Sequence, residues 1–373
     1  MRIIEKSYKG YKPLYPLERI CDPAGALFID IETTGLKKET TSLYLIGCGQ
    51  YTDEGFLTRL FFADTHEEEE DVLISFLDYM KDFTHLLHFN GTKFDIPYLQ
   101  YKFKRYGISD PFTKIAQVDI YKLCKPLRYL LFPESMRQKA IESFLGISRE
   151  DMYGGGELIE VYKDFEITGS DDDLKLLVTH NREDVLGMHL ILPILYYLDL
   201  QDMSLSFEDY TINEYRDYKD SLREEVIFNY TTDVAFPISF TAKTDTMYVR
   251  ASADNKKISI RLPIYDQDMY IFFDNYRDYC YIPDEDRAIL RTVACALPKD
   301  RYKKATKETC YQRFSGRCIK QPHAIFKPVL KTCYKDKKMY FRFPEDFNKE
   351  AAEEFGRSLI NVFFKTRKNL SLL

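Results

Sequence analysis

The sequence predicts an α/β fold for its first half, a mixed sheet flanked by helices, followed by a second, smaller α+β domain. Stretches with strand-like and helix-like periodicity alternate through the first half. After a polar, charged stretch the pattern changes to hairpin-like strands, and 373 residues suffice for two separate cores. We therefore expect an N-terminal domain over residues 1–200, a connecting segment over residues 201–224 and an α+β domain over residues 225–373.

The first half begins with three strands joined by tight polar connections, which predicts antiparallel pairing. A helix follows, with Thr65 as its cap, an acidic first turn and an apolar stripe. Short apolar strands then alternate with amphipathic stretches, so that the sheet is expected to be mixed. The expected strands span residues 26–32, 43–51, 56–63 and 85–90, and the expected helices span residues 65–83, 94–106, 137–145 and 172–198.

The second half is dominated by extended segments. Residues 246–264 predict a hairpin with a polar turn at Asp254–Asn255, and residues 269–282 continue in the same style. A second hairpin is expected over residues 327–343, and an amphipathic helix over residues 348–368 closes the chain.

The composition is that of an ordinary globular chain, with 45% hydrophobic and 30% charged residues. The sequence contains no run of 18 or more apolar residues, so it predicts no membrane span, and its first residues lack the apolar core of a secretion signal. The eight cysteines are scattered without a C-x-x-C pair, which favours reduced thiols. We therefore expect a cytoplasmic protein that does not enter the membrane.

Charge is distributed unevenly along the chain. Residues 301–342 contain thirteen Lys or Arg against two acids, although the whole chain has a net charge of −6. Cations interleaved with aromatic rings are typical of single-strand binding, but a hairpin with exposed lysines and core tyrosines has the same composition. A third alternative is that this domain recruits a protein partner. The aromatic residues concerned are Tyr302, Tyr311, Phe314, Phe326, Tyr334 and Tyr340.

The stretch ALFIDIETTGL, residues 26–36, places two carboxylates at the end of an apolar strand. Asp30 and Glu32 are two residues apart and therefore face the same side of the strand. Burying them needs compensating charge, and Mg²⁺ or Mn²⁺ would supply it through carboxylate oxygens. An exposed edge strand, or two separate salt bridges, would explain the same pair.

Two further acidic residues lie in helix-like segments. Asp95, in FNGTKFDIPYL, is placed at a helix start, where an acid also complements the helix dipole. His180 and Asp184, in VTHNREDVL, are four residues apart and share one helix face. A solvated acidic face and a hydrogen-bonded helix histidine are the ordinary alternatives.

Together, FIDIETTGL, FNGTKFDIPYL and HNREDV resemble the three motifs of the DEDD superfamily of 3′–5′ exonucleases, which have a ribonuclease H-like fold. The second motif is similar to that of proofreading domains in B-family polymerases. Residues 140–162 also resemble a bacterial group of predicted exonucleases with a ribonuclease H-like domain. The resemblance covers roughly residues 24–200.

The resemblance implies that Asp30, Glu32, Asp95 and Asp184 bind two divalent ions, Mg²⁺ or Mn²⁺, and with His180 catalyse phosphodiester hydrolysis in single-stranded DNA or RNA. His180 departs from the pattern, because it occupies the spacing at which members carry Tyr rather than His. An imidazole titrates closer to neutral pH than a phenol, so we expect His180 to orient or deprotonate the attacking water.

Four other residues are candidates for substrate binding. Thr33, Thr34 and Gly35 could offer backbone amides to the terminal nucleotide, although an ordinary turn is an equal alternative, and Asn90 could contact a phosphate or hold the helix start. The alternative functions are an RNA-trimming or structure-specific nuclease, and a non-catalytic nucleic-acid-binding protein of the same fold. The motifs do not distinguish DNA from RNA.

Overall fold

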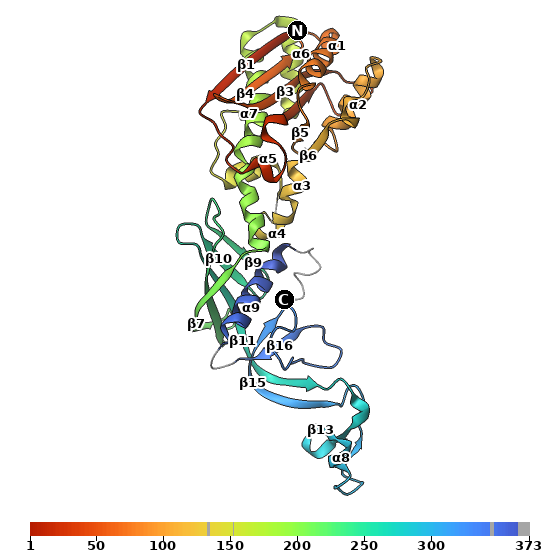
Figure 1. The fold of residues 1–373 in the computed structure, drawn as a ribbon, viewed down its shortest axis with the longest axis vertical. Coiled ribbons are helices and arrows are strands. Elements are labelled where there is room, and N and C mark those ends of the chain that lie inside the picture. Colours follow the sequence, from red (N-terminus) through yellow and green to blue (C-terminus); the bar gives the residue numbers. More distant parts are fainter. Residues whose placement is uncertain (133–134, 152, 344–346, 365–373) are drawn as a thin grey trace. The chain divides into compact units, whose positions relative to one another are not determined.

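The computed structural model describes residues 1–132, 135–151, 153–343 and 347–364 (Figure 1). The chain divides into two compact units, one made of residues 1–128 and 134–196 and the other of residues 129–133 and 197–373. Each unit is described by itself below.

The first unit is built on a six-stranded mixed sheet, as predicted. The three strands expected to pair antiparallel do so, whereas β5 and β6 run parallel to β2. One edge strand, β1, was not predicted, because its side chains are mostly exposed on both faces and give no alternation. In spatial order the strands are β1 (Arg2–Lys9), β4 (Gly55–Phe62), β3 (Leu43–Thr52), β2 (Ala26–Thr33), β5 (His85–His88) and β6 (Ala116–Asp119).

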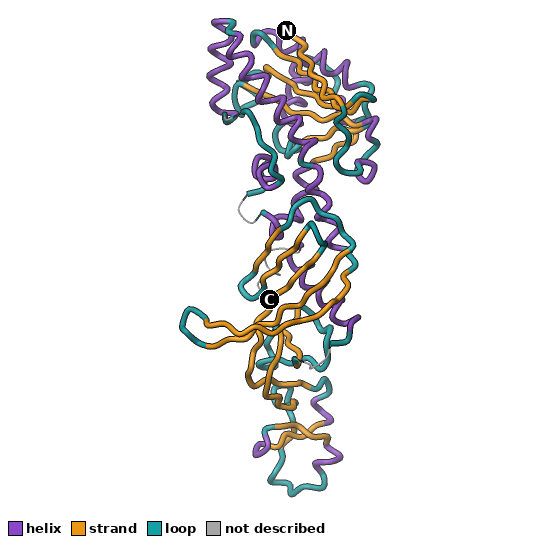
Figure 2. Tube along the Cα trace, turned by 90° about the vertical axis from the view of Figure 1, so that its left-hand side faces the viewer, coloured by secondary structure: helices purple, strands orange, loops and turns teal. Residues whose placement is uncertain are grey.

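Helices cover both faces of this sheet (Figure 2). Gly47 and Gly49 of β3 lie against side chains of one long helix, α7. Cys48, between them, must face the other way, and its cross-strand partner Arg59 lies over Tyr79 of the helix α1 at 4.2 Å. The helices of this unit are α1 (Glu69–Met80), α2 (Asp95–Arg105), α3 (Ile120–Cys124), α5 (Gln138–Phe144), α6 (Gly155–Thr168) and α7 (Asp171–Leu190). The short helix α4 (Arg128–Leu131) starts at the last residue before a boundary, and its other residues belong to the second unit.

The helix α7 begins where the sequence provides a cap. The Ser170 side chain accepts a hydrogen bond from the Asp173 backbone amide, and three acidic residues in the first turn complement the helix dipole. The α-helical part ends at Leu190, and the remainder of the expected helical region continues as a 3₁₀ helix, Leu192–Gln201. The helix α6 was not predicted as an element.

The second unit contains a seven-stranded antiparallel sheet and a small three-stranded one. The long strand β11 pairs with β8 and β10 along its first half and with β15 along its second. The larger sheet comprises β7 (Leu205–Arg216), β8 (Leu222–Thr232), β9 (Phe240–Lys243), β10 (Tyr248–Ser252), β11 (Lys257–Phe272), β15 (Tyr311–Gln321) and β16 (Met339–Arg342), and the smaller comprises β12 (Tyr279–Ile282), β13 (Arg287–Leu290) and β14 (Lys303–Lys304).

Two further helices lie in the second unit, α8 (Arg291–Ala294) and α9 (Lys349–Asn361), of which α9 packs against β7 and β8. The predicted end of the last helix, residues 365–368, lies outside the described residues. Residues 201–224, which we expected to connect two domains, form β7 and the start of β8 and are therefore part of the sheet.

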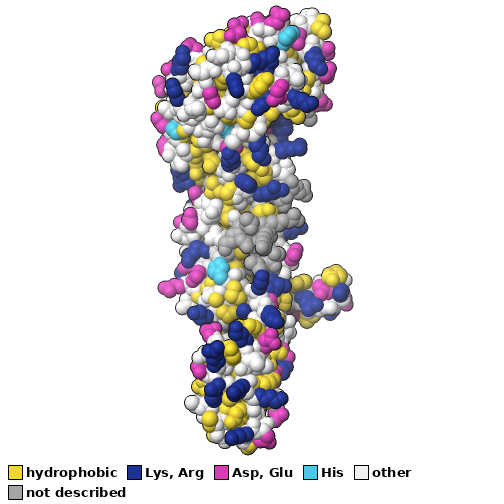
Figure 3. Space-filling view, turned by 90° about the vertical axis from the view of Figure 1, so that its right-hand side faces the viewer, with side chains coloured by type: hydrophobic (Ala, Val, Ile, Leu, Met, Phe, Trp, Pro, Cys, Tyr) yellow, Lys and Arg dark blue, Asp and Glu magenta, His cyan; other side chains and the backbone are white. Residues whose placement is uncertain are grey.

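The aromatic residues of the basic stretch 301–342 take part in packing inside the second unit. The Phe326 ring stacks on Phe341 with 4.2 Å between centroids, and Tyr340 is buried. The Tyr311 hydroxyl donates to Asp286. Figure 3 shows Lys and Arg interspersed with acidic side chains on the face that it presents. These contacts favour the hairpin interpretation over exposed stacking platforms.

Two further observations bear on the chain as a whole. All eight cysteines are free, as expected from their spacing. Among the described residues, no helix combines the length and the apolar character needed to cross a membrane.

Candidate active site

The end of β2 presents two carboxylates to α7. Asp30 pairs with Gly47 and Glu32 with Leu45 in the ladder, and a bulge after Glu32 ends the regular pairing. Because Gly47 faces α7, its partner Asp30 does so too, and Glu32 shares that side. Glu32 is buried, Asp30 is partly buried, and Asn181 of α7 donates to Asp30 Oδ2 at 2.8 Å.

His180 and Asp184 of α7 meet these carboxylates from the facing side. His180 Nε2 lies 3.4 Å from Glu32 Oε1 and 3.3 Å from Asp184 Oδ2. One ligand atom from each of the three residues lies within 4.8 Å of the other two, a spacing at which one cation can be bound. His180 and Asp184 are four residues apart and therefore lie on one face of α7, which places both side chains beside Glu32.

Asp95 joins the cluster from the first turn of α2. It is buried, and burial together with the charges of Asp119 and Asp184 raises its pKa to about 7. A side chain at Gly91 would place a Cβ 2.6 Å from Asp95 Oδ2, so this position leaves the carboxylate room only because it is glycine.

The loop before α2 is held by Asp119, at the end of β6. Asp119 Oδ1 accepts from the Asn90 backbone amide at 2.9 Å, and Oδ2 accepts from the Thr92 hydroxyl at 2.9 Å. Asn90 has a left-handed conformation, with φ of 62°, which asparagine tolerates better than most residues. Asp119 was not predicted, because nothing in its local sequence indicates a partner thirty residues away.

The acidic cluster is electrostatically strained without a cation. Burial, and then the neighbouring carboxylates, raise the pKa values of Asp30 and Glu32 well above their usual range. Among the described residues, Arg149 is the sole Lys or Arg within ion-pair distance of any of the four carboxylates, and Asp184 is the one that it contacts. Carboxylate oxygens are the ligands that Mg²⁺ and Mn²⁺ prefer, so the four carboxylates fit a divalent metal centre.

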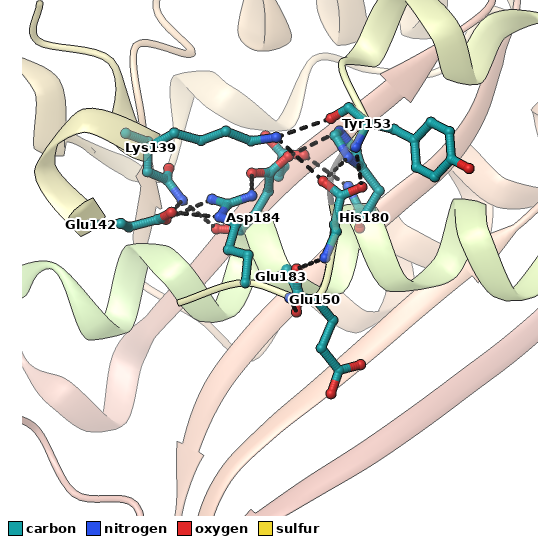
Figure 4. A network of polar contacts seen from close by, with 12 residues as sticks. Lys139, Glu142, Glu150, Tyr153, His180, Glu183 and Asp184 are labelled. Atoms are coloured by element: carbon teal, nitrogen blue, oxygen red, sulfur yellow. Dashed lines mark hydrogen bonds and ion pairs between the residues drawn. The ribbon is translucent and has the colours of Figure 1, made fainter. Parts of the chain in front are cut away.

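The segment of residues 149–151 contacts the α7 side of the cluster (Figure 4). Arg149 Nη1 donates to Asp184 Oδ1 at 2.5 Å, and the same guanidinium donates to both oxygens of Glu142 on α5. Glu183 accepts from the backbone amides of Glu150 and Asp151 at 3.0 and 2.9 Å. The side chain of Glu183, one residue before Asp184, thus anchors this segment.

Asp151 fixes the orientation of the His180 ring. Its Oδ2 lies 2.7 Å from His180 Nδ1, and Lys139 Nζ lies 3.3 Å from the same oxygen. Burial alone would raise the pKa of Asp151, but the hydrogen bond from the Tyr153 amide and the contact with His180 outweigh it, so the pKa is lowered. An ionised Asp151 accepts a hydrogen bond from Nδ1–H. In the neutral imidazole, Nε2 is then the acceptor nitrogen, and it faces Glu32 and Asp184.

The predicted substrate residues after β2 have partners within their own turn. The Thr33 hydroxyl donates to the Gly35 carbonyl at 2.9 Å, and the Thr34 hydroxyl accepts from the Ser42 amide at 2.9 Å. Hydrogen bonds within the turn thus account for the two threonines without a contact to a substrate. The structure thus brings together Asp30, Glu32, Asp95, His180 and Asp184, with Asn90 on the neighbouring loop.

The sheet order, the helices on both faces and the acidic cluster at the end of β2 define a ribonuclease H-like domain. Residues 27–196, just under half of the chain, match a family model described as RNase_H superfamily. The match is to the superfamily and not to the bacterial subgroup that the residues 140–162 resemble.

Solved structures with low sequence identity are also similar to the chain. One is the family B DNA polymerase of Pyrobaculum calidifontis, with 17% identity over 47% of this chain and 25% of the polymerase and a TM-score of 0.38. Another is a nuclease in its apo form, with 16% identity over 48% of this chain and 75% of the nuclease and a TM-score of 0.33.

A third is a complex of Escherichia coli exonuclease I with single-stranded DNA and zinc, with 13% identity over 55% of this chain and 54% of the enzyme and a TM-score of 0.27. The chain thus spans a quarter of the polymerase and about half of exonuclease I. No curated protein matches the sequence.

Proposed function

We propose that the chain is a metal-dependent 3′–5′ exonuclease that hydrolyses phosphodiester bonds of single-stranded nucleic acid. The observation that supports this proposal is the convergence of four carboxylates and the His180 Nε2 atom at the end of β2. The direction of digestion rests on the resemblance of the three motifs to those of the DEDD exonucleases.

Asp30, Glu32, Asp95 and Asp184 would hold two divalent ions, Mg²⁺ or Mn²⁺. When bound, such ions supply Lewis-acid charge at the scissile phosphate and lower the pKa of a bound water. The role we assign to the protein is placement: Asn181 fixes one oxygen of Asp30, and the buried strand end keeps both β2 carboxylates on the α7 side.

His180 would accept the proton of the attacking water at Nε2. Its Nδ1 proton points to Asp151, so the acceptor nitrogen is the one that faces the cluster. The neutral form of an imidazole can accept a proton at a ring nitrogen that carries none, which is what this role requires.

The Arg149–Asp184 ion pair favours the alternative, a nucleic-acid-binding protein without catalysis. The guanidinium uses one oxygen of a proposed metal ligand, and its second anchor at Glu142 holds it there. In a nuclease, the metal would have to share Asp184 with Arg149 or displace it.

One assay distinguishes these functions. The full chain is incubated with 5′-labelled single-stranded DNA and RNA in Mn²⁺ or Mg²⁺, alongside Asp30→Ala, Asp184→Ala and His180→Ala. The exposed Asp172→Ala on α7 is the matched control. We expect a descending ladder for the wild type and the control, and loss of digestion in the three site variants. Digestion that survives Asp30→Ala, or a wild type that digests neither polymer, would overturn the proposal.

A further inference from the structure

Next to the acidic cluster, the first unit has a hollow of about 470 Å³ whose function the cluster does not explain. This volume lies within the range of roughly 300–1,000 Å³ typical of small-ligand sites. The hollow is lined by Phe89, Asn90, Lys93, Tyr121, Arg128, Ser135, Met136, Arg137 and Gln138.

The hollow and the acidic cluster share two walls. Gln138 Nε2 donates to the Asp184 backbone carbonyl at 2.9 Å, so the start of α5 lies against the helix that carries Asp184. On the other side, Asn90 precedes Gly91, which lies directly beside the Asp95 carboxylate. A chain bound in the hollow would therefore lie next to the elements that carry Asp95 and Asp184.

The charge of the hollow is opposite to that of the cluster. Lys93, Arg128 and Arg137 are exposed, and no acidic residue is part of the lining. Within residues 1–132, 135–151, 153–343 and 347–364, none of these three side chains has an ion-pair partner. Three unpaired cations around one concave surface favour a ligand with several negative charges.

An aromatic pair forms part of the wall. Phe89 and Tyr121 pack edge to face, with 5.8 Å between centroids and an angle of 73° between planes, and both rings are only half-buried. Rings held by such a contact offer a surface on which a nucleic-acid base can stack. Cations that track phosphates, combined with aromatic rings, are the features of single-strand binding.

We propose that this hollow binds the part of the single strand adjoining the scissile phosphate, with a base against Phe89 and Tyr121 and phosphates at Lys93, Arg128 and Arg137. This inference rests on the proposed function and names the place where its substrate binds. The same chemistry would also suit a nucleoside monophosphate, so the experiment below separates the two ligands.

Binding of fluorescein-labelled ten-nucleotide oligothymidylate and oligouridylate to the full chain is measured by anisotropy in EDTA, where metal-dependent digestion stops. The test variant is Lys93→Gln/Arg128→Gln/Arg137→Gln. The control variant, Lys104→Gln/Lys114→Gln/Lys175→Gln, removes three exposed cations of the same unit that do not line the hollow.

We expect the test variant to bind at least about tenfold more weakly at physiological salt. In a plot of log affinity against log salt concentration, the magnitude of its slope should be smaller than that of the wild type by up to about 2. The control variant should match the wild type. Tyr121→Leu should weaken binding roughly 5- to 150-fold, while Tyr121→Phe, which keeps the ring, should restore most of it.

Unchanged affinity and salt slope in the test variant would overturn the inference, as would equal losses in test and control variants. Thymidine 5′-monophosphate that displaces the decamer at equal concentration would assign the hollow to a mononucleotide and also overturn it. Digestion in Mn²⁺ is followed in parallel. A wild type that binds but does not digest overturns the proposed function alone, because binding was measured without turnover.

Discussion

Replacing Lys102 with Met should destabilise the first unit by about 3 kcal/mol or more. Lys102 lies on α2, seven residues after Asp95, and its side chain is fully buried. Its Nζ lies 2.8 Å from Glu69 Oε1 and donates to the Thr41 carbonyl at 2.5 Å. The ammonium thus ties the helix that carries Asp95 to α1 and to the chain segment before β3.

The magnitude follows from what the substitution leaves behind. Removing one partner of a buried ion pair typically costs about 3–5 kcal/mol, because the other charge is left uncompensated. Glu69 keeps hydrogen bonds from the Leu43 amide at 2.6 Å and from the Tyr106 hydroxyl at 2.8 Å, so we expect the lower end of this range. The double variant Lys102→Met/Glu69→Gln should regain part of the loss, since its buried amide is neutral.

Because the chain has no Trp and two units, the measurement is urea-dependent hydrogen exchange of peptides from α2 and β3. Lys104→Met, an exposed substitution on the same helix, is the control and should change the unfolding free energy by less than about 0.5 kcal/mol. A loss below about 1 kcal/mol in Lys102→Met would refute the reasoning that the buried pair holds α2 in place.

Three further outcomes are expected. Burial lowers the pKa of His189 to about 4, so as pH falls below about 6.5 the unfolded chain binds this proton and the folded chain does not. Between pH 7 and pH 5 the unfolding free energy of the wild type should therefore fall by about 2 kcal/mol more than that of His189→Phe, measured by urea titration at both pH values. An equal fall in the two proteins would contradict this. Asp151→Ala should lower turnover of single-stranded nucleic acid by about 10- to 100-fold, because His180 loses its orienting acceptor; turnover equal to that of Asp172→Ala would exclude the role. Gly91→Ala should weaken Mn²⁺ binding measured by calorimetry, because its Cβ would displace the Asp95 carboxylate, and unchanged affinity would show that Asp95 is not a ligand.

The sequence predicted those parts of the molecule that local pattern determines. The alternation of a strand predicted that Asp30 and Glu32 face one side, and the spacing of a helix predicted the same for His180 and Asp184. Their assignment to one site came from the resemblance of the three motifs to those of the DEDD exonucleases. The mixed sheet followed from the alternation of strand-like and helix-like stretches. The edge strand β1 was missed because its exposed side chains show no period of two.

The supporting residues of the site were missed for a different reason. Asp119, Arg149 and Asp151 act through contacts with residues 29 to 35 positions away, which no local periodicity indicates. Each of the three is a charged residue in a loop or at the end of a strand, where charged side chains exposed to solvent are common, so its residue type gave no signal of a role in the site. The segment 201–224 looked like a connector because β7 is largely exposed and therefore polar.

The central claim, that the carboxylates at the end of β2 hold divalent ions, is tested most directly by Mn²⁺ binding to the wild type and to Asp30→Asn in isothermal titration calorimetry. We expect about two ions per wild-type chain, and at least about tenfold weaker binding in Asp30→Asn, with Asp172→Asn unchanged. Equal Mn²⁺ affinity and stoichiometry in the wild type and Asp30→Asn would contradict the assignment of this cluster as a metal centre.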